Sequence, residues 1–286
     1  MVATQTTDLV RTQPLKQGKR LRVAIAGLGA IGRVVAQKID AGMENLELVA
    51  VSARDADKAR RYLDGLDSKV ELLPLREHPE VAAVIVEALP ASAFDDLAEP
   101  ALRAGRMLVV ISVGALIPRP HLIEVAERHG GRIIVPTGAL IGLDAVKAAA
   151  EGNIASVRMV TRKPPKGLDR APYLVENEIR LDGLLEPMKV FEGSARDAVK
   201  GFPANVNVVA ALSLAGVGAD RTMIEIWADP STDRNRHRIV VDSDSASFSM
   251  EIANIPTEEN PKTGRITALS VVAAIRRIGS AMQVGT

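Results

Sequence analysis

Short apolar runs and amphipathic segments alternate between residues 21 and 140 of the chain. The apolar runs suit parallel strands that are buried on both faces, and the segments between them have the period of a helix. This alternation predicts an α/β fold built on a doubly wound parallel sheet of the Rossmann type. The expected strands are LRVAIAG, LELVAVSAR, VAAVIVEAL, RMLVVIS and GRIIVPTGAL, and the clearest helical segments between them are FDDLAEPALRAG and PHLIEVAERHG.

The pattern changes after about residue 150. Alternating apolar and polar positions there predict adjacent strands of a mixed or antiparallel sheet, whereas TRKPPKGLDRAPYLVEN is rich in proline and charge and predicts a loop. We therefore expect a Rossmann domain over residues 21–140 and a smaller α/β domain over residues 141–260. The expected strands of the second sheet are TMIEIWADP, HRIVVDSD and SFSMEIANIP.

Three helices are expected in the second half of the chain. Ser194 and Asp197 can cap a short helix, and VNVVAALSLAG forms a second, apolar helix. The last helix, within residues 261–286, is expected to begin with Asn260 as its cap and to pack back on the Rossmann domain. Its expected apolar face consists of Ile266, Leu269, Val272, Ala273 and Ile275.

Composition places the chain among ordinary globular proteins, because 47% of its 286 residues are hydrophobic and 25% are charged. The 36 Lys and Arg nearly cancel the 35 Asp and Glu, so the net charge of +1 gives no reason to expect nucleic acid as a partner. The chain has no cysteine, which excludes disulfides, thiolate catalysis and cysteine-based metal sites. We expect a small-molecule partner and no metal site.

Residues 1–20 are polar and lack the apolar stretch of a secretory signal, so we expect a flexible N-terminal tail. The longest apolar runs are shorter than a bilayer span and are bounded by proline or charge, so they predict buried strands rather than membrane segments. Together with the absence of cysteine, these features favour a cytoplasmic protein with no membrane partner.

A glycine-rich turn follows the first expected strand. Gly27, Gly29 and Gly32 form G-x-G-x-x-G between this strand and a helical segment, which is the order that dinucleotide-binding sites require. Gly27 allows a sharp turn, Gly29 allows a pyrophosphate to approach the backbone, and Gly32 allows the helix to pack closely on the strand. With Ala30 and Ile31 at the helix N-terminus, they form the expected pyrophosphate site. A glycine-rich turn without a ligand is the alternative.

The end of the second strand predicts which dinucleotide binds. NAD sites usually place Asp or Glu there to bind the ribose 2′-hydroxyl, but this chain has Ala53 between Ser52 and Arg54. Ser52 and Arg54 could bind a 2′-phosphate, which predicts NADP as the preferred cofactor and NAD as the alternative. Asp55 argues for NAD, and Arg54 could also be a surface residue without a ligand.

The nicotinamide ring of such a cofactor would lie near the turns that follow the later strands. These turns are Leu89-Pro90, Ser112-Val113-Gly114 and Pro136-Thr137-Gly138-Ala139. His78, His121 and His129 lie outside them and are expected on the surface.

His237 is the only histidine in the second half of the chain, and it lies among Arg234, Arg236 and Arg238. If the arginines are close to the imidazole, they lower its pKa and keep a neutral base available, or one of them binds a substrate carboxylate. Because side chains alternate along a strand, only one or two of them can face the site. The alternative is a solvated histidine at the end of a strand.

Longer motifs in the second half resemble those of the L-aspartate dehydrogenase family, and the resemblance covers nearly all of the chain after the tail. It implies a Rossmann domain and an α/β substrate domain, usually in a homodimer. The implied reaction is the oxidation of L-aspartate to iminosuccinate with NAD(P), which releases oxaloacetate and ammonia, or its reverse, which could supply pyridine nucleotide biosynthesis. The motifs are TGALIGLD, RKPP, FEGSARDAVKGFPANVNVVAALSLAG, ADPSTDRNRHRI and IANIPTEENPKTG.

The resemblance also implies roles for particular residues. Asn235-Arg236-His237 matches an N-x-H element of the family, which makes His237 the catalytic histidine, and Ala139 and Asn207 match contacts on the nicotinamide side. A histidine suits the proton transfer that imine formation requires near neutral pH. Ala53 departs from the acidic residue that NAD-preferring members tend to carry.

A dicarboxylate substrate requires cationic groups or several N–H donors, because buried carboxylates without partners are strongly destabilised. Lys163 could instead be a solvated loop residue, and Asn207 could simply cap its helix. The candidate substrate ligands are Lys163, Ser194, Asn205, Asn207 and Asn235.

Two other hypotheses fit the glycine-rich turn. One is another NADP-dependent reductase with the same two-domain plan, similar to dihydrodipicolinate reductase or homoserine dehydrogenase, although the substrate motifs of those families are not found. The other is a non-catalytic dinucleotide sensor, which the presence of His237 and Asn207 disfavours.

Overall fold

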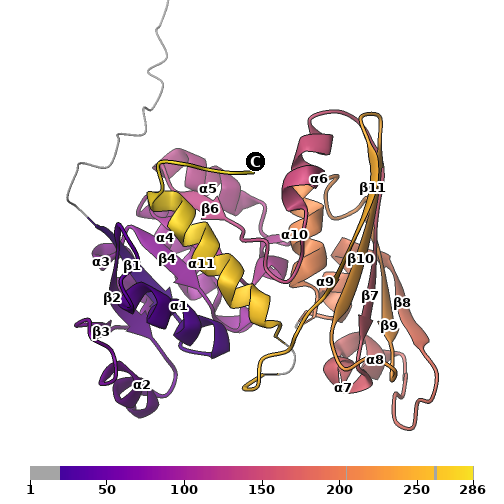
Figure 1. The fold of residues 1–286 in the computed structure, drawn as a ribbon, viewed down its shortest axis with the longest axis horizontal. Coiled ribbons are helices and arrows are strands. Elements are labelled where there is room, and N and C mark those ends of the chain that lie inside the picture. The colour runs from indigo at the N-terminus through magenta and orange to yellow at the C-terminus, as the bar shows by residue number, and fades with distance from the viewer. Residues whose placement is uncertain (1–19, 204, 261–262, 286) are drawn as a thin grey trace, which may run out of the picture.

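The computed structural model describes residues 20–203, 205–260 and 263–285, so the expected tail falls outside the described residues apart from its last residue. Figure 1 shows two α/β units, each built around its own sheet. The chain passes from the first unit to the second near residues 135–142 and returns to the first through the segment around residues 254–264.

Six parallel strands form the first sheet: β1 (Leu21–Ala26), β2 (Leu46–Ser52), β3 (Glu71–Leu72), β4 (Val84–Glu87), β5 (Met107–Val110) and β6 (Arg132–Ile134). Their order is β3-β2-β1-β4-β5-β6, and every pairing is parallel. The order reverses between β1 and β4, and ligands of doubly wound sheets bind beyond the strand ends at such a reversal. The predicted Rossmann-type sheet is confirmed, and the glycine-rich turn lies at the reversal.

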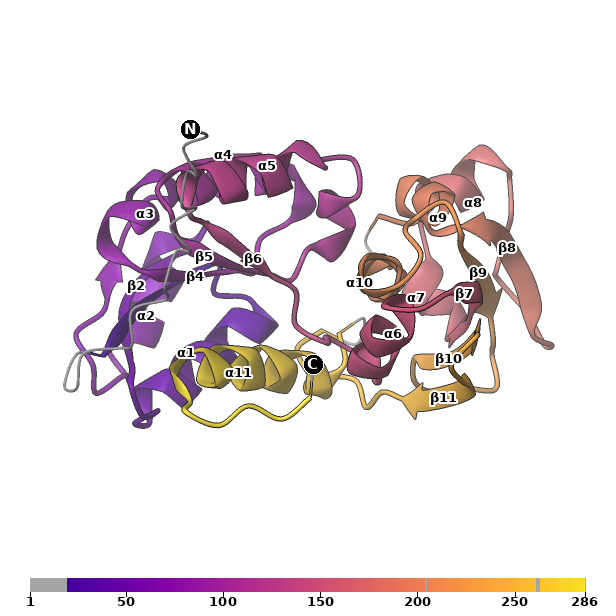
Figure 2. The same cartoon turned by 90° about the horizontal axis from the view of Figure 1, so that it is seen from above.

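Helices cover both faces of the first sheet (Figure 2). Val84 and Val86 of β4 pack in the core on one face, and Ile85 packs in the core on the other. The apolar run of this strand is therefore buried on both sides, as its sequence predicts. One face is covered by α1 (Ala30–Asp40) and α11 (Arg265–Gly279), the other by α4 (Asp95–Arg103) and α5 (His121–His129), and α2 (Ala56–Leu63) and α3 (His78–Val81) complete the unit.

The last helix, α11, packs against α1 but differs from the prediction in its start and its buried face. Its N-cap is Gly264, and Asn260 lies in the preceding segment. Ile266 and Leu269 of the expected face are 39% and 50% exposed, and Ala273 is exposed as well. The buried stripe of α11 has the spacing of one helix face but is rotated from the expected one. It consists of Ala268, Val271, Val272 and Ile275.

Five strands form the second sheet: β7 (Ile154–Lys163), β8 (Met188–Ser194), β9 (Thr222–Ala228), β10 (Arg236–Ser243) and β11 (Ser247–Ala253). Their order is β11-β10-β7-β9-β8, with β7 parallel to β9 and antiparallel to β10, so the predicted mixed sheet is confirmed. The three predicted strands are not all adjacent, because β7 separates β9 from β10. Charged residues such as Arg158 and Arg162, which alternate with buried ones, concealed β7 in the sequence.

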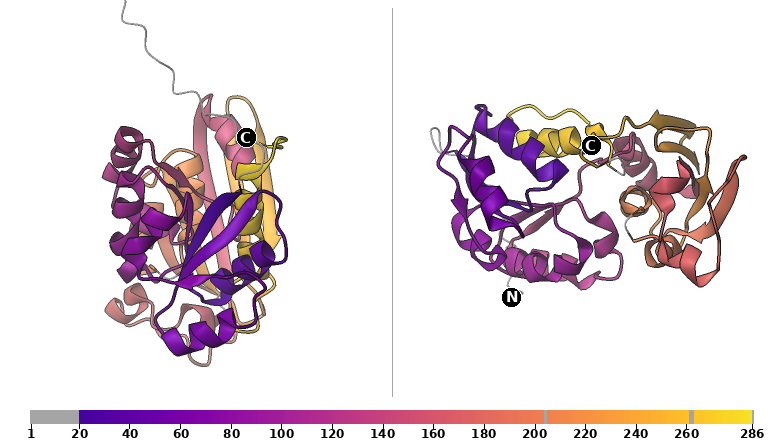
Figure 3. Two further views of the ribbon diagram at one scale, coloured as in Figure 1. Left: turned by 90° about the vertical axis from the view of Figure 1, so that its left-hand side faces the viewer. Right: turned by 90° about the horizontal axis from the view of Figure 1, so that it is seen from below.

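Helices cover one face of the second sheet, and its other face carries no helix among the described residues (Figure 3). Ser194 is the N-cap of α9, as predicted, and accepts a hydrogen bond from the backbone N–H of Asp197. The segment expected as a loop contains the end of β7 and two short helices. The helices of this unit are α6 (Leu143–Ala150), α7 (Pro165–Leu168), α8 (Pro172–Glu176), α9 (Ala195–Gly201) and α10 (Asn207–Ala215).

His78 begins α3 and is completely buried, so the expectation that it lies on the surface is wrong. Its neighbours in the sequence REHPE are polar, which concealed its burial. Burial lowers the pKa of His78, because a charged imidazole is poorly solvated there. His121 and His129 are exposed, as expected.

Candidate functional site

The glycine-rich turn has the shape that a dinucleotide requires. Gly27 has a φ of +104°, and a Cβ atom there would collide with the carbonyl oxygen of Ala88. A Cβ atom on Gly32 would collide with the carbonyl oxygen of Gly27, so both positions require glycine. Around the Cβ position of Gly29, apart from its chain neighbours, no atom lies within 4 Å. Gly29 therefore leaves open space at the N-terminus of α1, which begins at Ala30.

The surroundings of this turn fit an NAD(P) cofactor. Gly29 is the N-cap of α1 and makes no side-chain capping hydrogen bond, which leaves N–H groups for a pyrophosphate. Ser52 at the end of β2 is 7% exposed, and its hydroxyl has no partner among the described residues. Arg54 is exposed, and within the described chain it has no hydrogen-bond or ion-pair partner. Asp55 accepts a 2.9 Å hydrogen bond from the backbone N–H of Lys58 and so caps α2.

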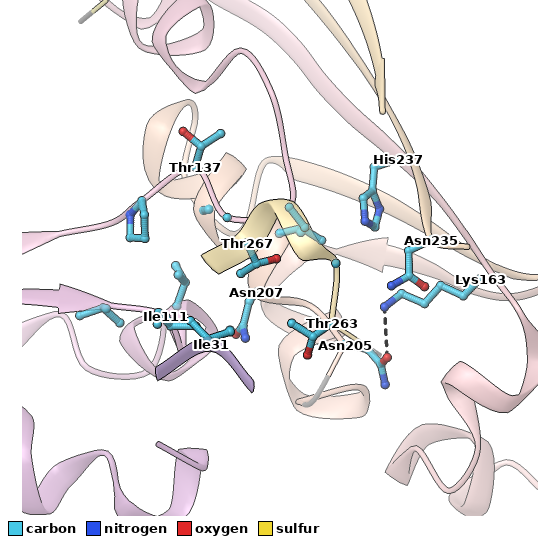
Figure 4. A pocket seen from close by; sticks show the side chains of 18 residues that line it. Ile31, Ile111, Thr137, Lys163, Asn205, Asn207, Asn235, His237, Thr263 and Thr267 are labelled. Atoms are coloured by element: carbon cyan, nitrogen blue, oxygen red, sulfur yellow. Dashed lines mark hydrogen bonds between the residues drawn. The ribbon is translucent and has the colours of Figure 1, made fainter. Parts of the chain in front are cut away.

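A pocket lies between the carboxyl ends of the first sheet and the helix-covered side of the second (Figure 4). Its volume is about 750 Å³ when the space open to solvent is counted. Two of the three expected turns contribute to it, with Val113 from one and the segment Pro136–Ala139 from the other. The other lining residues are Ile31, Val110, Ile111, Lys163, Asn205, Asn207, Val208, Ala211, Asn235, His237, Thr263, Gly264 and Thr267.

His237 lies on the inner face of β10, directly opposite Thr161 of β7. His237 is 2% exposed, and its Nδ1 lies 3.2 Å from Oγ1 of Thr161. Burial and, to a smaller extent, the positive charge of Lys163 lower the pKa of His237 to about 3. The imidazole is therefore neutral at physiological pH, with one nitrogen that donates and one that accepts.

The arginines beside His237 in the sequence do not face it, contrary to the expectation that they tune its pKa. Arg236 and Arg238 alternate with His237 along β10 and are exposed on the opposite face of the sheet. Arg234 pairs with the preceding aspartate at 2.6 Å. The charge that acts on the imidazole instead comes from Lys163 on the neighbouring strand.

Lys163 is the last residue of β7 and is 5% exposed, so it is not a solvated loop residue. Its Nζ donates a hydrogen bond to Oδ1 of Asn205 at 3.1 Å, and Asn235 lies beside the two in Figure 4. Thr161 and Lys163 are two positions apart on one strand, so their side chains and that of His237 share one face of the sheet. A buried ammonium at the edge of a pocket favours an anionic ligand.

Asn207 links the two units at the pocket. Its Oδ1 accepts a 3.0 Å hydrogen bond from the backbone N–H of Gly114, which lies in a 3₁₀ turn after β5. The N-cap of α10 is Val206, so capping does not explain Asn207. A second link joins Ala139, whose carbonyl oxygen accepts a 3.0 Å hydrogen bond from Nδ2 of Asn254. These bonds fix the turns on which a nicotinamide would lie.

Ser194 does not line the pocket. Its hydroxyl donates to a carboxylate oxygen of Asp197 at 2.7 Å and accepts from the backbone N–H of Asp197 at 3.2 Å. The hydroxyl is therefore occupied at the N-terminus of α9, which accounts for this serine without a ligand.

Glu87 is a polar residue near the pocket that the sequence analysis did not single out. It ends β4, is completely buried, and accepts hydrogen bonds from the backbone N–H groups of Leu89, Ile111 and Ser112 at 2.9 to 3.1 Å. Burial raises the pKa of the Glu87 carboxyl, and the three donors oppose this effect. Its carboxylate joins the turns after β4 and β5. An acidic residue inside the apolar run VAAVIVEAL was the signal for it.

Thr161, Thr263 and Thr267 were also missed. Thr161 contacts the ring of His237, while Thr263 and Thr267 bring the start of α11 to the pocket. Nothing in the local sequence marks them, because their importance comes from strand register and from the return of the chain to the first unit.

Two family models together match most of the chain. The model described as "Aspartate dehydrogenase, C-terminal" matches residues 144–278, and the model described as "Homoserine dehydrogenase, NAD binding domain" matches residues 27–136. The gap between the two matches coincides with the passage from the first unit to the second.

Curated relatives and a solved structure give the same result. The chain is 56% identical over 266 residues to the L-aspartate dehydrogenase of Bradyrhizobium diazoefficiens, which covers 93% of this chain and 94% of that protein. It is 50% identical over 269 residues to L-aspartate dehydrogenase 3 of Bordetella bronchiseptica, with 94% and 98% covered. The aspartate dehydrogenase structure from Thermotoga maritima superimposes with a TM-score of 0.71 at 26% identity, covering 93% of this chain and 100% of that one. The chain belongs to the L-aspartate dehydrogenase family of NAD(P)-dependent enzymes.

Proposed function

We propose that the chain oxidises L-aspartate to iminosuccinate, which yields oxaloacetate and ammonia, and that it catalyses the reverse reductive amination. The observation that carries the proposal is the pairing, in one pocket, of the neutral imidazole of His237 with the buried ammonium of Lys163, which are 2% and 5% exposed. This pair fits an amino dicarboxylate, which brings negative charge and a nitrogen that must lose a proton. The nicotinamide of the cofactor, when bound, accepts the hydride from Cα.

Lys163, Asn205 and Asn235 are the proposed ligands of the substrate carboxylates. Lys163 supplies charge from a buried position, where attraction to a carboxylate is only weakly screened. Asn205 holds the ammonium through its Oδ1 atom, which leaves its amide NH₂ group to donate to the same carboxylate. Asn235 lies beside Lys163 and brings a second amide to the same part of the pocket (Figure 4).

His237 is the proposed group that transfers the proton of the amino nitrogen. In the free protein its pKa is about 3 because of burial and the nearby charge of Lys163. A carboxylate bound at Lys163 offsets that charge and raises the pKa of His237 toward a value suited to proton transfer. Substrate binding therefore offsets the smaller of the two causes that keep the pKa of His237 low.

Ala139 and Asn207 are the proposed contacts of the nicotinamide. Oδ1 of Asn207 is bonded to Gly114, and its NH₂ group has no partner among the described residues, so it can donate to the carboxamide oxygen of the ring. Gly27, Gly29, Ala30, Ile31 and Gly32 are the proposed pyrophosphate site.

Ser52 and Arg54 are the proposed ligands of a 2′-phosphate, so we propose that NADP is preferred and NAD is the alternative cofactor. The hydroxyl of Ser52 is buried without a partner, and Asp55, the nearest acidic residue, is occupied as a helix cap. Arg54→Ala should lower the NADPH preference by about 1–3 kcal/mol, and Ala53→Asp should shift it toward NADH. Steady-state kinetics with both cofactors measures the preference. A wild-type enzyme that strongly prefers NADH and is insensitive to Arg54→Ala would contradict this proposal.

A homodimer in the cytoplasm is also proposed. The uncovered face of the second sheet carries Met223 and Val240, 41% and 37% exposed, beside Arg158, Arg238 and Glu251. A sheet face with exposed apolar and complementary charged side chains is suited to a second copy of itself. Among the described residues, none of the helices is both long and apolar enough to span a membrane. Light scattering in solution measures the mass of the assembly.

Incubation of the purified protein with NADPH, oxaloacetate and ammonia tests the proposed reaction. NADPH absorbance should fall, and in a panel of 2-oxo acids oxaloacetate should be the best substrate because the pocket is built for a second carboxylate. A reductase of another substrate class would consume NADPH only with a different carbonyl compound. A dinucleotide sensor would bind NADPH and show no turnover with any member of the panel.

A further inference from the structure

We propose that Thr161 is a positioning residue that holds the neutral imidazole of His237 in the tautomer with its proton on Nε2. The resting pocket then offers the substrate a hydrogen-bond donor rather than a base. The role of this donor in turnover rests on the proposed function, but the tautomer is a property of the free protein and can be measured without a substrate.

Strand register brings the two side chains together. Thr161 and His237 are directly opposite each other in the antiparallel pair of β7 and β10, and both point to the helix-covered face. Thr161 is 1% exposed and His237 is 2% exposed, so water does not compete for the bond between Oγ1 and Nδ1. Oγ1 of Thr161 and Nδ1 of His237 are 3.2 Å apart, within hydrogen-bond distance.

The hydroxyl of Thr161 determines the direction of this bond. A buried hydroxyl proton requires an acceptor, and for the hydroxyl of Thr161 the described residues offer only Nδ1 of His237. If Nδ1 carried the proton of the imidazole, it would donate to Oγ1, and the hydroxyl proton would be buried without an acceptor. The bond is satisfied on both sides only when Thr161 donates to Nδ1, which places the imidazole proton on Nε2.

The Nε2 atom is the free end of the ring. Among the described residues it has no hydrogen-bond partner, and His237 lines the pocket together with Lys163 and Asn235 (Figure 4). An Nε2–H group can donate a hydrogen bond to a carboxylate oxygen of the substrate. Proton transfer at Nε2 requires that Nδ1 and Thr161 first exchange roles, so that the ring proton lies on Nδ1 and donates to Oγ1. In the oxidative direction Nε2 then accepts the proton of the amino nitrogen, which gives an imidazolium, and in the reductive direction this imidazolium returns the Nε2 proton to nitrogen.

The experiment measures the tautomer directly by NMR in protein labelled with ¹⁵N-histidine. Long-range ¹H–¹⁵N spectra distinguish protonated from unprotonated ring nitrogens, and the chain has only 4 histidines, so the loss of one signal set in His237→Asn assigns the resonances. In the free wild type we expect Nδ1 unprotonated and Nε2 protonated. Thr161→Ser, which keeps the hydroxyl, should give the same spectrum. Thr161→Val, which has the same shape without the hydroxyl, should lose the fixed tautomer.

Activity provides the second measurement. Thr161→Val should lower kcat roughly ten- to a hundredfold with the Kd for NADPH unchanged, and Thr161→Ser should restore most of the rate. A wild-type spectrum with the proton on Nδ1 would overturn the proposal, whether or not Thr161→Val folds. A Thr161→Val variant with the wild-type tautomer and wild-type kcat would overturn it as well. Absence of activity toward aspartate together with the expected wild-type spectrum would reject the proposed function and leave the tautomer assignment intact.

Discussion

The two sides of the pocket are built in opposite ways. On the side of the first sheet, the shape depends on backbone: Pro136–Ala139 is a turn that lines the pocket. The nearby glycine-rich turn, which reaches the pocket at Ile31, requires Gly27 and Gly32 because any Cβ would strike a carbonyl oxygen. On the side of the second sheet, the chemistry depends on polar side chains such as Lys163 and His237, which are buried on strands. Backbone suffices for a pyrophosphate, whereas a particular amino acid requires charge and a titratable group at fixed positions.

This difference predicts how each side responds to mutation. A change at Gly27 or Gly32 alters shape and therefore acts on folding and on cofactor binding together. A change at a buried side chain of the second sheet removes one chemical group from a face that the strands hold in place, so it acts on turnover or on substrate binding alone.

The largest effect is expected from His237→Asn. Turnover should fall by roughly 10²–10⁴ because the proposed proton-transfer group is lost, while NADPH binding should stay nearly unchanged because the proposed pyrophosphate site lies in the first unit. Steady-state kinetics and a fluorescence titration with NADPH measure the two quantities. Arg238→Gln is the matched control, since this neighbour lies on the opposite face and should leave both unchanged. A variant with weaker aspartate binding and full kcat would show that His237 is a carboxylate ligand instead.

Lys163→Met should act on substrate binding. Loss of a charged partner for a carboxylate should raise the KM for aspartate roughly ten- to a hundredfold, corresponding to about 1.5–3 kcal/mol, with NADPH affinity preserved. Lys166→Met, three positions along the chain and exposed, is the control and should have no effect. An unchanged KM in Lys163→Met would place the carboxylate site elsewhere in the pocket.

Gly27→Ala and Gly29→Ala should separate folding from cofactor binding. Gly27→Ala forces a Cβ against Ala88 and should cost about 1–3 kcal/mol of stability along with NADPH binding. Gly29→Ala meets no atom in the free protein, so its Tm should match the wild type while NADPH binds more weakly. Thermal unfolding and NADPH titration measure the two effects. Unchanged NADPH affinity in Gly29→Ala would contradict the assignment of Gly29 to the pyrophosphate.

The sequence predicted the first unit better than the second, and the reason is again that one side depends on a local backbone turn and the other on side chains of distant strands. A glycine-rich turn is local, and its residues are adjacent in the chain, so Gly27, Gly29 and Gly32 could be given roles from the sequence. The environment of His237 depends on the register between β7 and β10, which are far apart in the sequence. Its polar contacts, Thr161 and Lys163, therefore could not be derived, and the adjacent arginines were given an influence that Lys163 has instead.

Buried polar residues were the other limit of prediction. Glu87 and His78 are completely buried in the first unit although their residue types are usually exposed. Glu87 is held by backbone N–H groups of two turns, a set of partners that exists only once the parallel sheet has formed.

The smallest expected effect concerns the loss of stability at acid pH. It allows one buried histidine of each unit, His237 and His78, to be compared. Above about pH 6.5, the imidazole of His237 is neutral in both the native and the unfolded states. As pH falls below 6.5, the unfolded state takes up a proton that native His237 does not accept until about pH 3, so stability falls across this interval. The burial of His78 lowers its pKa and acts in the same direction. Between about pH 7 and pH 5.5, His237 should account for roughly 1 kcal/mol of lost stability.

Urea unfolding of the free protein at both pH values gives the change in the free energy of unfolding with pH. This change is compared between variants, so the comparison does not depend on the absolute stability of each variant. His237→Asn and His78→Leu should each show a weaker pH dependence than the wild type. His121→Asn, which removes an exposed histidine, should behave as the wild type does. Each of the first two variants removes the buried histidine of one unit. The variant that loses more of the pH dependence of stability identifies the unit whose buried histidine limits acid stability. A His237→Asn variant with the wild-type pH dependence would mean that the native imidazole is protonated near neutral pH, and that Lys163 and burial do not hold it neutral.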